Sequence, residues 1–319
     1  MILTEFTLLI IGVTFIVLAL LSITLYFIFR NVENLLRGIG FAALGLAHMA
    51  AVLYHSNIIN GFFIYEQAPL ALENPAEWVP FIGVESIAFR GPPTLLFYYL
   101  KSAAQPAIYS PGTMNFWLMI GAKALVALGL IALAYLAEVM VLAGRWPRLA
   151  FTGVIALLNV VAVVLAYSAG SAVDGPVEAG EVGQILIRAN LSVALQGISG
   201  LIVVGVIAYG VFRIFKETGE RSYLVQAASW GIFALLIIPA TILGSSLASN
   251  IALEAARSEA ARILLGAMLI VATLATLVAS TLLILGAILE LLPTGIEEEL
   301  EEEVEEEVGG EAVTEEGRA

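Results

Sequence analysis

Few residues inside the long apolar stretches of this chain could do chemistry, and four of them lie at similar depths. His48, Lys123, Asn159 and Gln196 each lie about eight to twelve residues from an end of their stretch, which at 1.5 Å per helical residue is close to the middle of a bilayer. Polar groups are costly there, so these four predict a midplane polar site for an ion, a proton relay or a small ligand. The alternative is structural: Lys123 extends to the outer headgroups and the two amides bond between helices.

His48 is also the preferred ligand if the chain holds a haem b. His48 and His55 share a helix face, since seven residues make about 700° of rotation, but they lie about 10 Å apart along the axis. They cannot bind one iron from opposite sides, and the chain has no third histidine. A haem held by His48, alone or with Met119 or Met268, is therefore an alternative, while no cofactor is predicted outright.

Other sequence signatures argue against enzyme chemistry. Motifs for a zinc protease helix and a phosphate-binding loop are absent, Asp174 is the only aspartate, and the chain has no cysteine. The last apolar stretch has no lysine to hold a retinal. We expect no catalytic residues and no metal site. Glu138 and Arg145 lie seven residues apart on one helix face, which predicts a structural ion pair.

The composition defines the class of protein. Hydrophobic residues make up 60% of the 319, and charged residues 13%, about half of their share in soluble domains. We expect an all-α integral membrane protein with about seven transmembrane helices, because seven stretches approach or exceed the required length of about 20 residues. Residues 1–56 would contain the first two helices and residues 115–292 the other five. The stretches are Glu5–Phe29, Gly38–Ser56, Asn115–Gly144, Pro147–Ala169, Gln184–Phe212, Tyr223–Ser246 and Ala260–Leu292.

The positive charges predict an orientation. Short loops after the first, third and fifth stretches hold seven of the fourteen basic residues, against five on the opposite side, and such an excess favours the cytoplasmic side. These residues are Arg30, Arg37, Arg145, Arg148, Arg213, Lys216 and Arg221. We therefore expect the N-terminus outside and the C-terminus in the cytoplasm.

Two segments lie outside the expected helices. Residues 57–114 form a proline- and aromatic-rich extracytoplasmic cap, in which Thr94–Leu100 is apolar but too short to span and is expected to be an interfacial or re-entrant helix. Residues 293–319 form an acidic cytoplasmic tail with twelve Glu and one Arg, a net charge of −11 out of −13 for the chain. The tail is either a solvated extension or a docking segment for a basic protein.

These features favour a non-enzymatic, multi-pass subunit or scaffold of a larger complex in the cell membrane. A haem-b-binding respiratory subunit and a transporter or seven-helix sensor with a midplane polar site are the alternatives. The expected partners are the lipid bilayer and either membrane proteins or further copies of the chain, and no basic surface suits nucleic acid. Few Asn and Gln residues and no Cys favour a thermophilic source, and the source is expected to be prokaryotic.

Overall fold

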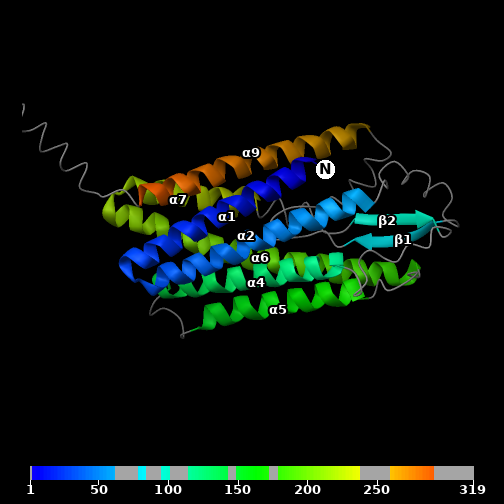
Figure 1. The fold of residues 1–319 in the computed structure, drawn as a ribbon, viewed down its shortest axis with the longest axis horizontal. Coiled ribbons are helices and arrows are strands. Elements are labelled where there is room, and N and C mark those ends of the chain that lie inside the picture. The colour runs from blue at the N-terminus through cyan, green and yellow to red at the C-terminus, as the bar shows by residue number, and fades with distance from the viewer. Residues whose placement is uncertain are drawn as a thin grey trace, which may run out of the picture.

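The structure is a computed structural model that describes residues 2–61, 78–83, 95–100, 114–142, 149–171, 179–237 and 259–290. In these residues, seven helices lie side by side in an elongated bundle, with a small β-hairpin beyond one end (Figure 1). The helices are α1 (Ile2–Phe29), α2 (Val32–Gly61), α4 (Met114–Met140), α5 (Ala150–Ser171), α6 (Ala179–Thr218), α7 (Arg221–Ile232) and α9 (Glu259–Leu289). The last turns of α7 continue as a π-helix, η1 (Phe233–Ile237).

Six of these helices, all except α7, are long and apolar enough to cross a membrane. This confirms six of the seven predicted spans and the assignment to a multi-pass helical membrane protein. The remaining predicted span, Tyr223–Ser246, is described only as far as Ile237, so its full length and the kink expected at Pro239 lie outside the described residues. Arg145, the region 172–178 and the acidic tail also lie outside them.

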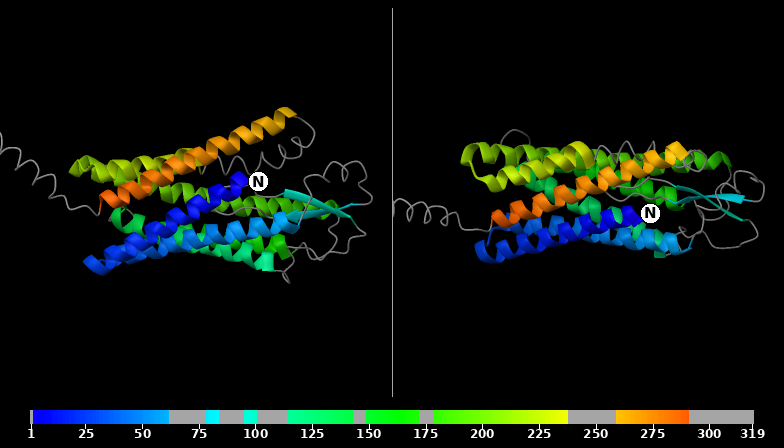
Figure 2. Two further views of the ribbon diagram at one scale, coloured as in Figure 1. Left: turned by 45° about the horizontal axis from the view of Figure 1, so that its top comes forward. Right: turned by 90° about the horizontal axis from the view of Figure 1, so that it is seen from above.

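Six helices form a closed ring, and α5 packs outside it. Around the ring, α1 contacts α2, α2 contacts α4, α4 contacts α6, α6 contacts α7, α7 contacts α9, and α9 returns to α1. Helix α5 lies outside this ring and contacts only α4 and α6 among the described helices. Figure 2 shows the same bundle from two further sides. The ring is the feature that creates an interior axis, along which inward-facing side chains from all six helices can meet.

The distribution of side chains is the one expected in a membrane. The outer face of α5 carries Val154, Leu157, Val160 and Val164, all more than half exposed. The interior instead holds polar side chains, such as Ser192, Ser199 and Thr276 with no exposed surface. Because water disfavours so much exposed aliphatic surface, the bundle's outer surface suits lipid.

Tight turns gather the positive charges at one end of the bundle. Residues Arg30–Asn31 join α1 to α2, and Gly219–Glu220 join α6 to α7; Gly219 has φ +77°, a conformation that suits glycine. The same end holds the start of α5 and the end of α9. We call it the arginine-rich end, after its described basic residues Arg30, Arg37, Arg213, Lys216 and Arg221.

The prediction of an interfacial or re-entrant helix at Thr94–Leu100 is wrong. Residues Leu95–Leu100 form strand β2, which pairs antiparallel with β1 (Trp78–Gly83), with Phe81 opposite Phe97. The segment is rich in aromatic residues, which favour strands, and six residues are too few for a stable isolated helix. Pro80 is tolerated because both strands of a two-stranded sheet are edge strands.

Glycines allow the closest helix contacts in the ring. A Cβ atom on Gly129 of α4 would lie 2.6 Å from Leu44 Cγ and 3.0 Å from the carbonyl oxygen of Gly40, both on α2. Gly40 in turn faces the α4 backbone at Gly129. The α2–α4 contact is thus set by two facing glycines, as small residues allow in membrane bundles.

We predict that Gly129→Ala lowers the thermal unfolding midpoint of the purified protein. The added methyl group cannot be accommodated without moving α2 or α4, and such overpacking costs about 1–3 kcal/mol. The matched control is Gly121→Ala on the same helix, where a Cβ meets nothing within 4 Å. Equal midpoints for the two variants would contradict the close α2–α4 contact.

Candidate functional site

The predicted midplane residue Lys123 is bonded to Gln196 across the α4–α6 contact. Lys123 has no exposed surface, and its Nζ donates to Gln196 Oε1 at 3.3 Å. In return, Gln196 Nε2 donates to the backbone carbonyl of Lys123 at 2.9 Å. Among the described residues no carboxylate contacts this amine, so the amide of Gln196 is its partner.

Asn159 joins the same network from α5. Its Nδ2 donates to Ser199 Oγ at 2.9 Å, and Ser199 Oγ donates to the Gln196 carbonyl at 2.9 Å. The network thus connects α4, α5 and α6, and it attaches the outer helix α5 to the ring. The structure therefore brings together three of the four residues of the predicted midplane site.

His48 lies elsewhere, between α1 and α2. Its Nδ1 bonds with the Leu44 carbonyl at 2.7 Å, and its ring lies 5.9 Å from the Phe15 ring. A Cβ added at Gly12 would lie 3.3 Å from His48 Cβ, so α1 packs directly on this residue. A haem would need open space of porphyrin size beside the imidazole. The described surroundings of His48 are helix packing, which does not fit that group, and no step is assigned to haem.

Glu138 caps a neighbouring helix. Its Oε2 accepts hydrogen bonds from the backbone N–H of Thr152 at 2.9 Å and from Thr152 Oγ1 at 2.6 Å, in the first turn of α5. A carboxylate is favourable at a helix N-terminus, where the backbone N–H groups lack partners. Because Arg145 is outside the described residues, its ion pair with Glu138 stays a prediction.

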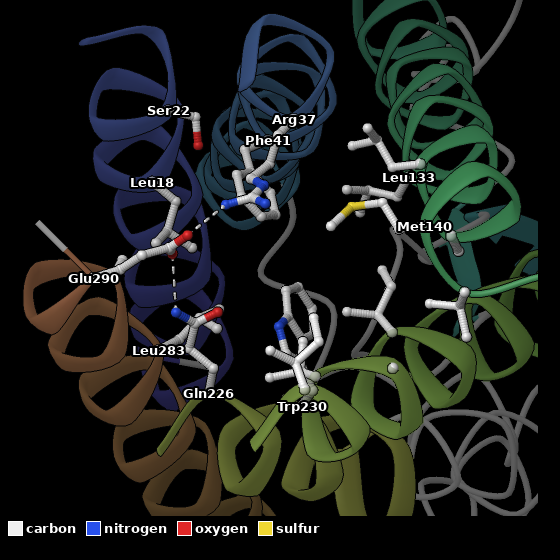
Figure 3. Close-up of a pocket in the computed structure, with 18 of the residues that line it drawn as sticks. Leu18, Ser22, Arg37, Phe41, Leu133, Met140, Gln226, Trp230, Leu283 and Glu290 are labelled. Carbon is white, nitrogen blue, oxygen red and sulfur yellow. Dashed lines mark hydrogen bonds and ion pairs between the residues drawn. The ribbon is translucent and has the colours of Figure 1, made fainter. Parts of the chain in front are cut away.

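A cavity of about 250 Å³ opens between the six ring helices at the arginine-rich end (Figure 3). Each ring helix contributes to its lining, whereas α5 does not. The walls are mostly apolar and include Leu18, Leu133, Met140 and Leu283. An apolar enclosure with a few polar groups is the usual character of small-molecule sites.

The charged and amide groups that line the cavity come from α2, α6, α7 and the end of α9. Arg37 of α2 and Glu290, next to the end of α9, form an ion pair with Nη1 and Oε1 3.6 Å apart. Gln226 of α7 donates to Glu290 Oε2 at 3.1 Å and to the Gly286 carbonyl at 3.2 Å. Arg213 and Glu217 form a second, exposed pair one turn apart on α6, at 2.8 Å.

Four aromatic rings lie at the inner limit of the cavity, and we call them the aromatic quartet: Phe15, Phe41, Trp230 and Phe233. Neighbouring centroids are 5.8 to 6.3 Å apart around the group. Phe41 and Trp230 also line the cavity, while Phe15 and Phe233 lie about one turn deeper on their helices. Phe15 contacts His48 on its other side, so the quartet separates the cavity from His48.

Sequence reasoning missed the cavity residues. From the sequence, Arg37 is one of several loop charges, and Gln226 and Glu290 lie close to the ends of their predicted spans. Only Glu290 could have been singled out from the sequence, because a carboxylate within the predicted span Ala260–Leu292 needs a partner.

The fold and the spans define a multi-pass helical membrane protein with an internal cavity. No family model matches the chain, and neither a curated protein nor a solved structure shows a significant match. The functional interpretation therefore depends on the site itself.

We predict that Lys123 and Gln196 are energetically coupled. Gln196→Leu removes both described side-chain bonds and leaves the Lys123 amine buried without its acceptor, which costs about 1–3 kcal/mol. Adding Lys123→Met should recover part of this loss, so a double-mutant cycle on thermal unfolding should show positive coupling. Gln184→Leu, at an exposed position of α6, is the control. Strictly additive effects would mean that the bond contributes nothing.

Proposed function

We propose that this chain is a multi-pass membrane protein that binds a small ligand in the cavity at its arginine-rich end, as a transporter or a seven-helix sensor. The cavity is the observation that supports this proposal. Its walls could bury an apolar group, and its mouth offers a cation, an anion and an amide. Small-molecule sites between helices of bundles commonly combine these features.

The polar network at Lys123 is a less suitable binding site. Its members are joined mainly to one another and to neighbouring backbone carbonyls, and they do not line the cavity. We therefore assign the network to the attachment of α5, and the ligand to the cavity. This moves the proposed site from the midplane to one end of the bundle.

A role as a subunit or scaffold of a larger cell-membrane complex, from a prokaryotic source, is the second proposal, and the acidic tail would be its docking segment. The two proposals are compatible, because a ligand-binding protein can belong to an assembly. Gentle purification followed by native mass spectrometry addresses both, since the spectrum reports bound small molecules and accompanying chains. A lone, ligand-free monomer would count against both.

We also propose that the arginine-rich end faces the cytoplasm. The natural chain has no cysteine, so the single variant Lys216→Cys offers one labelling site. A membrane-impermeant maleimide should label this variant only after cells are permeabilised. Labelling of intact cells would reverse the orientation, and the cavity would then open to the outside.

The cavity proposal predicts the effect of a substitution that fills it. Ala287 of α9 lines the cavity, and Ala287→Phe adds a ring to the ligand's space. We expect the small-molecule adduct in the native mass spectrum of the wild-type protein to be lost in this variant. The added bulk is at the open end of the bundle, so the thermal midpoint should change little.

The matched control is Ala267→Phe, on an exposed part of the same helix. It adds the same ring to the lipid-facing surface and should keep the adduct. An adduct retained equally by both variants would place the bound molecule outside the cavity and would refute the proposal.

A further inference from the structure

Arg37 has unused hydrogen-bonding capacity beside the cavity. Its side chain is 24% exposed, and its described ion-pair partner, Glu290, lies at 3.6 Å, which is too far for a good hydrogen bond. A guanidinium group carries five N–H donors, and none of them reaches an acceptor within 3.5 Å among the described residues. Guanidinium donors that are only about a quarter exposed still need an acceptor, either water or a ligand.

Glu290 faces the same space but is held in place. Gln226 donates to its Oε2 at 3.1 Å and is itself fixed by the Gly286 carbonyl. The other oxygen, Oε1, is the one nearest Arg37. Figure 3 shows the two charged groups approaching each other from different helices. A cation and an anion are therefore both available to a ligand at one point.

The charges that line the cavity balance. Arg213 and Glu217 are closely paired at 2.8 Å and are more than half exposed, so they satisfy each other in solvent. Arg37 and Glu290 are the remaining charged pair in the lining. A purely anionic ligand would place two anions on Arg37, and a purely cationic ligand would place two cations on Glu290. For groups that are about three-quarters removed from solvent, either imbalance is unfavourable.

We propose that the ligand is an amphipathic zwitterion of the apolar amino-acid class. Its carboxylate accepts hydrogen bonds from Arg37, its ammonium group donates to Glu290, and its apolar side chain lies in the cavity. Arg37 can bind a carboxylate with two parallel N–H bonds, and the four charges then alternate in sign. This inference rests on the proposed function, because it names the ligand of the same cavity.

The size and walls of the cavity fit this class. A volume of about 250 Å³ is below the common range for drug-sized ligands, so it suits one apolar side chain and not a whole phospholipid. Phe41 and Trp230 form the inner wall, where they could contact an aliphatic or aromatic group. The aromatic quartet also sets the depth that the apolar part can reach.

The experiment measures ligand-induced shifts of the thermal midpoint for the unaltered, full-length protein in detergent or nanodiscs. The probes are L-alanine, L-leucine, L-phenylalanine and L-tryptophan. Their charge-blocked relatives are N-acetyl-L-leucine, which is an anion, and L-leucinamide, which is a cation. We expect stabilisation by the apolar zwitterions larger than alanine, and binding that is about tenfold weaker or worse for both blocked forms.

Variants at the mouth test the assigned roles. Arg37→Gln and Glu290→Gln should each weaken binding of the zwitterion by about tenfold or more, because each removes one charge-assisted contact. In addition, Arg37→Gln should reduce discrimination against L-leucinamide, and Glu290→Gln should reduce discrimination against N-acetyl-L-leucine. Arg221→Gln, at the same end but outside the cavity lining, is the control and should bind as the unaltered protein does.

The outcomes separate this inference from the proposed function. If N-acetyl-L-leucine or L-leucinamide binds the unaltered protein as well as L-leucine does, zwitterion recognition is refuted while a cavity ligand remains. If no probe binds but the native mass spectrum shows an adduct that Ala287→Phe abolishes, the ligand class is wrong and the cavity function stands. If no probe binds and no such adduct exists, both proposals fail.

Discussion

Polar groups inside a bilayer have no water to bind, so each must find its partner within the protein. This constraint explains how the helices are joined. Ser192 donates to the Ala162 carbonyl between α6 and α5, and Ser229 donates to the Ala279 carbonyl between α7 and α9. The Lys123–Gln196 pair does the same between α4 and α6. Each bond satisfies a polar side chain and at the same time fixes which helices are neighbours.

Two of the six contacts that close the ring, α4–α6 and α7–α9, contain such bonds, and the cavity lies inside the ring. Six helices around one axis leave a centre that side chains must fill. The large rings of Phe15, Phe41, Trp230 and Phe233 fill it at one level. Toward the arginine-rich end the inward-facing residues do not fill the centre, which is open there as a cavity. The charged residues at its mouth are near the bundle's end, where a charged side chain costs less free energy than at the midplane.

Much of the fold could be predicted from the sequence, since span length and hydropathy alone locate the six long helices. The common depth of Lys123, Asn159 and Gln196 also anticipated part of one network. The pairing of Arg37 with Glu290 could not be anticipated, because it depends on α9 returning beside α1 to close the ring. The strand at Leu95–Leu100 shows a related limit. A short apolar segment is read as helix or strand only once its pairing partner, here Trp78–Gly83, is known.

Helix α7 contributes two of the residues that shape the cavity. Gln226 holds Glu290 at the mouth, Trp230 forms part of the inner wall, and both lie on α7. One turn later the chain becomes π-helical at Phe233–Ile237, a geometry that is often found at functional sites. The π-helix ends two residues before Pro239, whose missing N–H and bulky ring are incompatible with a regular α-helical bond to Leu235. The π-helix therefore begins three residues after Trp230, directly beyond the part of α7 that lines the cavity.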